Sequence, residues 1–254
     1  MSHQHYDDPV AAYDRLAPVY WGYAKRRERY LLSVERLIAH RVQGATSLLD
    51  MGAGDGTRAT RIAATAGIPN LVLLEPSSAM SGTPTSSAER WAMRAEDLRP
   101  EHMARRFDAI TCLWNVLGHI PAIDRERVLR ASSQLLTPEG RIFLDVNHRY
   151  NARSYGWIAT SARWLRDAVT QDVRKGDVTA IWKIGGGRSI STFGHVFTHR
   201  EMVGLAQAAG VEIEERIVID YENGSVHDIT WLGNLLYIFR RSSRTDSSNA
   251  PTTS

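Results

Sequence analysis

A glycine-rich loop within residues 48–60 combines residue types that bind charged ligands. Three glycines alternate at positions 52, 54 and 56, and two aspartates, Asp50 and Asp55, stand before and inside the loop. Glycine lets the backbone turn sharply and lets a ligand approach without a Cβ in the way. The two carboxylates would repel a pyrophosphate but attract a ligand that carries an ammonium and a sulfonium. The loop therefore predicts a site for a cationic ligand.

The spacing of the glycines differs from a dinucleotide fingerprint. That fingerprint, G-x-G-x-x-G, needs a glycine where Thr57 stands. Glu75 ends the next apolar run, nineteen residues after Gly56, and an acidic side chain in this place binds the two hydroxyls of a ribose. The spacing alone leaves open whether the adenosine belongs to NAD or to another cofactor.

Short apolar runs that alternate with helical patterns indicate how these residues are positioned. We expect strands at 46–51, 70–75, 90–94, 107–114 and 141–147, and later at 211–220 and 234–241. Helices are expected at 121–137, closed by the TPEG turn, and at 198–210, with one or two more before the first strand. The alternation predicts an α/β fold with a mainly parallel, doubly wound sheet. Ligands bind such sheets at the carboxyl ends of the strands, where the glycine loop and Glu75 lie.

The domain organisation predicted from the pattern is one domain over residues 11–240. Residues 1–10 and 241–254 are polar and are expected to be flexible ends. The less regular stretch at about 151–197 holds several aromatic residues and is expected to be an insertion on the acceptor side of the sheet.

Composition narrows the class of protein. With 43% apolar and 23% charged residues, the 254-residue chain is typical of a globular protein. The single cysteine, Cys112, allows no intramolecular disulfide and no thiol metal cluster. We therefore expect a reducing, cytoplasmic setting and no metal. No signal peptide or bilayer-spanning run is evident, so we expect no membrane partner. A net charge of only +3 makes nucleic acid an unlikely partner.

Over residues 47–147 the chain resembles the class I S-adenosylmethionine-dependent methyltransferases. The matching motifs, in order, are LLDMGAGDGT, VLLEPSSAM, RAEDL, FDAITCLWNVLGHI and LTPEGRIFLDV, with GNLLYIFRR near the end. The resemblance implies a Rossmann-like sheet of seven strands, N-terminal lid helices and an insertion after the fifth strand. It also implies S-adenosylmethionine as the cofactor and S-adenosylhomocysteine as the product.

The resemblance assigns cofactor-binding roles by position. Asp50 and the loop would hold the methionine part, Glu75 the ribose, and three short segments the adenine and the cofactor floor. The complete set is Asp50, Gly52, Ala53, Gly54, Gly56, Glu75, Pro76, Ser77, Ala95, Glu96, Asp97, Leu113, Trp114 and Asn115, with Tyr13 and Tyr20 from the lid. Two features depart from the family pattern: Arg94 stands where many relatives have an aspartate, and Gly82 and Pro84 should shorten the helix after the second strand.

Candidates for the acceptor side are fewer. His119 and His148 follow the fourth and fifth strands, and an imidazole that titrates near neutral pH can act as a general base. A bracing role for either histidine stays open. We also expect Asn147, Tyr150, Trp157 and Trp182 to bind the acceptor, although aromatic residues at such spacing also form cores.

The resemblance implies a methyltransferase (EC 2.1.1.-), and we expect it to transfer a methyl group in line to an oxygen or nitrogen of a small molecule. An RNA base methyltransferase is the alternative within enzymes. A protein that binds S-adenosylmethionine without transfer, and more remotely a nicotinamide dehydrogenase, also stay open. The acceptor and the choice between monomer and homodimer are not predicted.

Overall fold

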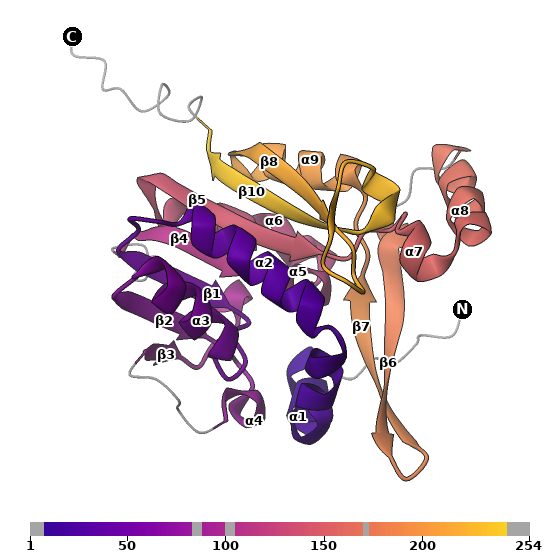
Figure 1. Ribbon diagram of the computed structural model, residues 1–254, viewed down its shortest axis with the longest axis horizontal. Coiled ribbons are helices and arrows are strands. Elements are labelled where there is room, and N and C mark those ends of the chain that lie inside the picture. The colour runs from indigo at the N-terminus through magenta and orange to yellow at the C-terminus, as the bar shows by residue number, and fades with distance from the viewer. Residues whose placement is uncertain (1–7, 83–87, 100–104, 170–172, 243–254) are drawn as a thin grey trace.

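An eight-stranded sheet forms the centre of the computed structural model, which describes residues 8–82, 88–99, 105–169 and 173–242 (Figure 1). The strand order is β3-β2-β1-β4-β5-β10-β8-β9. Strands β1 to β5 pair in parallel, whereas β10 is antiparallel to both β5 and β8. The strands are β1 (Ser47–Met51), β2 (Asn70–Leu74), β3 (Glu89–Trp91), β4 (Phe107–Cys112), β5 (Leu136–Val146), β8 (Val211–Ile219), β9 (Val226–His227) and β10 (Asn234–Arg241). The predicted α/β sheet is confirmed, with the two-residue β9 as an eighth strand.

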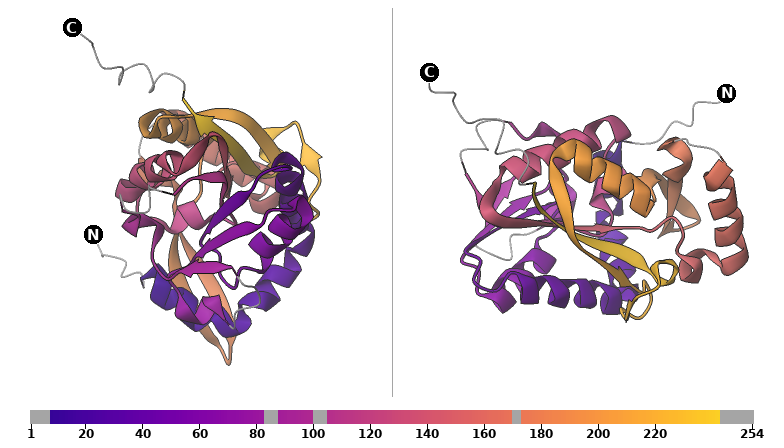
Figure 2. Two further views of the ribbon diagram at one scale, coloured as in Figure 1. Left: turned by 90° about the vertical axis from the view of Figure 1, so that its left-hand side faces the viewer. Right: turned by 90° about the horizontal axis from the view of Figure 1, so that it is seen from above.

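Helices cover both faces of the sheet (Figure 2). One face carries α2 (Glu28–Arg41) and α3 (Thr57–Ala66), and the other carries α6 (Ala122–Gln134) and α9 (His199–Ala209). Neighbouring residues of β1 point to opposite faces, as a strand requires. Leu48 packs in the cluster of α2 and α3, and Leu49 in the cluster of α6 and α9. The sheet is therefore doubly wound, as predicted.

The boundary between α6 and β5 differs from the prediction. Residues 137–140 were expected to form a turn, but α6 already ends at Gln134 and β5 begins at Leu136 and runs through them. Leu136 pairs with Phe107, and a bulge follows in β4. A Cβ added at Gly140 would lie 2.8 Å from the Phe107 carbonyl oxygen, so the proline-glycine pattern here marks a close strand contact instead of a turn.

The segment before the sheet forms two helices, as expected. The first, α1 (Pro9–Arg26), begins inside the segment predicted to be a flexible end, and the Asp8 side chain caps it by accepting from the Ala11 N–H. Arg241, at the start of the other segment predicted to be flexible, instead lies in β10 and pairs with Val211 of β8. Residues 1–7 and 243–254 of the predicted ends lie outside the described residues. Helix α4 (Ser78–Ser81) has only four residues, in line with the predicted shortening after β2. No helix in the described ranges has both the length and the apolar character that a membrane crossing requires.

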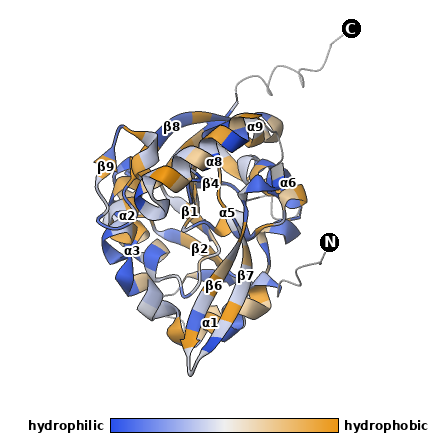
Figure 3. Ribbon diagram, turned by 90° about the vertical axis from the view of Figure 1, so that its right-hand side faces the viewer, coloured by the Kyte–Doolittle hydropathy of each residue, from blue (hydrophilic) through white to orange (hydrophobic). Residues whose placement is uncertain are grey.

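The predicted insertion forms two helices and a hairpin. Helices α7 (Ala152–Tyr155) and α8 (Trp157–Val169) are followed by a short 3₁₀ turn, η3 (Val173–Gly176), and then by strands β6 (Asp177–Gly185) and β7 (Arg188–His195). The β6–β7 hairpin crosses in front of the carboxyl ends of the parallel strands and lies beside α1 (Figure 3). The insertion and α1 thus enclose the edge of the sheet at which ligands bind.

Candidate active site

A cavity of about 340 Å³ lies at the carboxyl ends of β1, β2 and β4, beneath α1. The glycine loop, Glu75 and the 3₁₀ turn η1 (Ala95–Asp97) form one part of its wall, and α1 and α5 (Val116–His119) form the other. A volume of this size is typical of a site for a small ligand. Most of the predicted cofactor residues line it, namely Tyr13, Tyr20, Asp50, Gly52, Ala53, Gly54, Glu75, Pro76, Ser77, Ala95, Glu96, Leu113 and Trp114.

The glycine loop is fixed by backbone hydrogen bonds and by Glu75. The N–H groups of Gly52 and Ala53 both donate to the Leu74 carbonyl oxygen. Gly52 has a φ of +72°, and a Cβ there would lie 2.6 Å from a Val116 methyl group. One Glu75 carboxylate oxygen accepts from the Gly54 N–H and the other from the Ser77 N–H, each at 2.8 Å. The loop therefore places the Glu75 carboxylate against the cavity, where a ribose diol could meet it.

Asp50 brings a buried carboxylate to the same wall. Its side chain accepts a 2.6 Å hydrogen bond from the Thr111 hydroxyl. Burial raises the pKa of Asp50 to about 6, although the Thr111 hydrogen bond and the Arg58 charge act in the opposite direction. At neutral pH Asp50 is mostly ionised and can pair with an ammonium group.

The loop after β4 holds a strained backbone. Trp114 and Asn115 have φ angles of 56° and 63°, in the left-handed region that costs a residue with a Cβ about 1 kcal/mol or more. Their N–H groups donate to the carboxylate and the carbonyl oxygen of Asp145. The Asn115 amide oxygen accepts from the Asn147 N–H, and its NH₂ group donates to the His195 carbonyl oxygen. These contacts fix the cavity floor.

His119 and Tyr13 meet at the end of the cavity next to the β6–β7 hairpin. His119 Nδ1 lies 2.7 Å from the Phe193 carbonyl oxygen, which can only accept, so Nδ1 carries the proton. The other ring nitrogen, Nε2, therefore accepts from the Tyr13 hydroxyl at 2.9 Å. Burial is the main reason that the pKa of His119 is lowered. A neutral imidazole is a proton acceptor, so this pair has the chemistry of a general base.

Helix α1 is tied to the cavity rim by two further contacts that the sequence did not reveal. The Arg94 guanidinium donates to both carboxylate oxygens of Asp8 at 2.7 Å. The Ser77 hydroxyl donates to Asp14 in the middle of α1. Arg94, which departs from the family pattern, thus pairs with the cap of the lid helix. Partners separated by more than sixty residues leave no local pattern that could have predicted these contacts.

Three predicted cofactor residues do not line the cavity. Gly56 supplies a left-handed turn just before α3. Asp97 lies within 3.5 Å of Arg99, where half of its side chain is exposed. Asn115 braces the floor from behind. Their predicted direct contacts with a cofactor therefore rest on the resemblance alone.

The predicted acceptor residues are spread over two places. Trp182 packs its ring against Tyr13 and Tyr23, with centroids 6.3 and 5.1 Å apart, directly behind the cavity wall. Asn147, His148, Tyr150 and Trp157 are not part of that wall. Burial lowers the pKa of His148 to about 4, and its backbone N–H donates to the Asn234 side chain. The structure does not bring His148 to the cavity.

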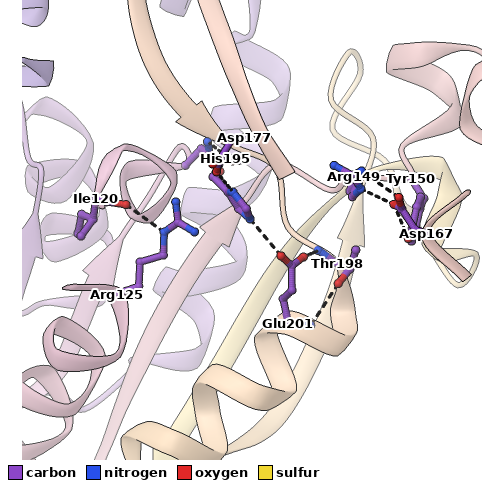
Figure 4. Close-up of polar contacts among 10 residues, drawn as sticks. Ile120, Arg125, Arg149, Tyr150, Asp167, Asp177, His195, Thr198 and Glu201 are labelled. Atoms are coloured by element: carbon purple, nitrogen blue, oxygen red, sulfur yellow. Dashed lines mark hydrogen bonds and ion pairs between the residues drawn. The ribbon is translucent and has the colours of Figure 1, made fainter. Parts of the chain in front are cut away.

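Polar contacts outside the cavity anchor the insertion (Figure 4). His195, at the end of β7, places Nδ1 2.7 Å from Asp177 and Nε2 3.2 Å from Glu201 of α9. On the other side of the insertion, Asp167 accepts from Arg149 and from the Tyr150 hydroxyl. These contacts fix both the hairpin and α8 to the main domain. The Tyr150 hydroxyl is thus already engaged with Asp167.

A family model described as a methyltransferase domain matches residues 20–216 of the chain. A search of curated proteins gave no match. Among solved structures, the CcbJ methyltransferase of Streptomyces caelestis aligns with a TM-score of 0.67 at 15% identity, over 94% of this chain and 100% of that one. The 1,6-didemethyltoxoflavin-N1-methyltransferase of Burkholderia thailandensis aligns with a TM-score of 0.59 at 15% identity, over 96% of this chain and 94% of that one. A sugar N-methyltransferase from Streptoalloteichus aligns with a TM-score of 0.59 at 18% identity, over 96% of this chain and 98% of that one.

These solved structures share the fold, and the family model covers most of the chain. The predicted resemblance is thereby confirmed, together with S-adenosylmethionine as the cofactor. The chain belongs to the methyltransferase domain family and has the class I, Rossmann-like fold of S-adenosylmethionine-dependent methyltransferases.

Proposed function

We propose that this methyltransferase acts on an oxygen or nitrogen atom of a small molecule, bound at the Tyr13 and His119 end of the cavity. One observation carries the proposal: aromatic side chains of α1 and of the loop after β4 line this end, and Trp182 of the β6–β7 hairpin packs behind them on Tyr13. Tyr20 lies between Tyr13 and Trp114, with ring centroids 6.0 and 5.3 Å away. Such an enclosure suits a flat or apolar molecule of limited size. The toxoflavin-precursor and sugar enzymes with the same fold lend support by analogy.

The residues at the glycine-loop end of the cavity are suited to bind S-adenosylmethionine. Glu75 would hold the ribose hydroxyls, Asp50 the ammonium, and the glycine loop the chain between them. When bound, S-adenosylmethionine supplies a methyl group activated by the positive charge on sulfur. The task of the protein is then to align the acceptor atom with that group, and positioning alone supplies much of the rate enhancement.

Tyr13 and His119 would take the proton of an acceptor hydroxyl or amine. The Tyr13 oxygen accepts this proton, and its own hydrogen passes to His119 Nε2 along the 2.9 Å contact. The Phe193 carbonyl oxygen keeps the proton on Nδ1 and so keeps Nε2 ready to accept. The proposal uses His119 and not His148, because only His119 lines the cavity.

The test is mass-spectrometric detection of methylated product from a panel of phenols, amino sugars and nitrogen heterocycles, with RNA assayed in parallel. With an active acceptor, His119→Ala and Tyr13→Phe should each lower turnover by about 100-fold or more. The resemblance places Tyr13 among the cofactor residues, whereas this proposal assigns its hydroxyl to the acceptor. The affinity for S-adenosylhomocysteine should therefore stay within about threefold in both variants. His40→Ala, an exposed histidine at the end of α2, is the matched control.

Transfer to RNA with no activity on any small molecule would reject the proposal. Salt-sensitive RNA binding would point the same way. Unchanged turnover in His119→Ala would remove the base from the mechanism. Cofactor binding without transfer to any acceptor would instead favour a non-catalytic binding protein.

A further inference from the structure

A buried group of charges lies between α2 and α3, beside the cavity. Glu35, with only 6% of its side chain exposed, accepts from the Arg58 Nε at 3.1 Å. The same carboxylate accepts two hydrogen bonds from Arg61, each at 2.8 Å. Two guanidinium groups therefore share the Glu35 carboxylate.

Arg58 has a hydrogen-bond donor that this group leaves without a partner. Its side chain is 16% exposed, and the Nη2 nitrogen is buried with no hydrogen-bond partner among the described residues. Burying a charged donor without a partner costs its full desolvation free energy, which is larger than the net stabilisation from a typical hydrogen bond. Arg58 also lines the cavity. An anionic ligand group in the cavity would give this donor a partner.

The position of Arg58 indicates which anionic group this is. Arg58 is the second residue of α3, directly after the glycine loop, and it pairs with Glu35 of α2. It therefore lies next to the loop that follows Asp50, and its charge acts on Asp50. An amino acid carries an ammonium and a carboxylate on the same carbon. Asp50 is suited to the ammonium, and a carboxylate beside it needs a cationic donor.

We propose that Arg58 binds the carboxylate of the amino-acid part of S-adenosylmethionine through Nη2, and that Glu35 is the positioning residue that orients its guanidinium. The inference rests on the cofactor and not on the identity of the acceptor. Arg58 would then select for the complete amino-acid part of the methyl donor. A fragment that lacks this part gains nothing from the contact.

Isothermal titration calorimetry with two ligands tests this inference. S-adenosylhomocysteine carries the carboxylate, whereas 5′-methylthioadenosine keeps the adenosine and lacks the amino acid. Arg58→Met should weaken S-adenosylhomocysteine binding by about 10- to 100-fold, the usual value of a hydrogen bond to a charged group. Binding of methylthioadenosine should change by no more than about twofold, because the contact concerns only the missing part.

The variant should fold, because Glu35 keeps both hydrogen bonds to Arg61. Arg58→Lys keeps the charge and offers a second variant, with an expected loss between wild type and Arg58→Met. Arg41→Met is the matched control, since Arg41 forms a similar ion pair with Glu215 away from the cavity. Thermal unfolding of every variant accompanies the titrations.

Three outcomes would overturn the inference. Equal losses for both ligands would mean that Arg58 only supports the fold. Unchanged binding of both ligands would mean that the carboxylate lies elsewhere. A selective loss in Arg61→Met, with none in Arg58→Met, would move the role to the other arginine. Absence of S-adenosylhomocysteine binding in the wild type would instead reject the cofactor, a result that differs from all three.

Discussion

The two ends of the cavity are built in different ways. The cofactor end comes from one continuous stretch, from Asp50 to Trp114, together with the lid helix. The proposed acceptor end joins Tyr13, His119 and Trp182, which come from α1, α5 and the β6–β7 hairpin. The first is a property of the strand-loop-helix units themselves, and the second exists only after the chain has folded.

The difference also concerns what fixes each end. Backbone groups hold the cofactor end: the Gly52, Gly54 and Ser77 N–H groups all have partners within the motif. Side chains hold the acceptor end, through the Tyr13 to His119 contact and a set of ring contacts. Side chains can be exchanged without changing the fold. The acceptor end is therefore where relatives with one architecture can differ in substrate.

Replacing Glu75 should weaken cofactor binding more than any other change proposed here. A small effect would contradict the view that the motif around the glycine loop holds the cofactor. Glu75→Ala removes the acceptor of two loop N–H groups and of the ribose hydroxyls. Hydrogen bonds to a charged group contribute about 1.5–3 kcal/mol each, so the loss in S-adenosylhomocysteine affinity should be about 100-fold or more. Calorimetry measures the effect. Glu89→Ala is the control, because Glu89 pairs with Arg105 outside the cavity and should leave affinity unchanged.

Asp50 should make cofactor binding depend on pH, an intermediate effect at the same end. Its pKa in the folded protein is raised from 3.8 to about 6. The ammonium needs the ionised carboxylate, so affinity for S-adenosylhomocysteine should rise by about tenfold between pH 5 and pH 7. The folded state also holds this proton more tightly than the unfolded chain. The Asp50 contribution to stability is therefore present below about pH 4 and is lost as the pH rises through about 6.

Asp50→Asn separates this carboxylate from other groups that titrate. The variant should lose the rise in affinity between pH 5 and pH 7 and the matching fall in the free energy of unfolding. Methylthioadenosine, which lacks the ammonium, should show no such rise with wild type. A pH dependence that survives in Asp50→Asn would assign it to Glu75, whose pKa is also raised by burial.

The same contrast explains how far the sequence could predict this protein. The strands along the chain, the glycine loop and Glu75 could be predicted because each signal lies within one short segment of the sequence. The helix predicted at 198–210 is also present as α9, and a capping box between Thr198 and Glu201 begins it. The contacts of Arg94 with Asp8 and of Ser77 with Asp14 could not be predicted, because each joins segments far apart in the chain. His119 and His148 follow their strands alike in the sequence, and only the fold separates them.

Substitution of two tryptophans in the insertion tests how far the proposed acceptor site extends. The expected changes in the KM for the acceptor are the smallest effects predicted here. Trp182→Ala removes a ring that packs on Tyr13 and should raise the KM for the acceptor by about fivefold, the value of an aromatic contact. Trp157, 56% exposed on α8, contacts Trp231 and lies outside the cavity wall, so Trp157→Ala should change KM by less than about twofold. Steady-state kinetics with the acceptor measures both. Equal effects would mean that the acceptor site extends from the hairpin to α8, and that the acceptor is larger than the cavity beneath α1.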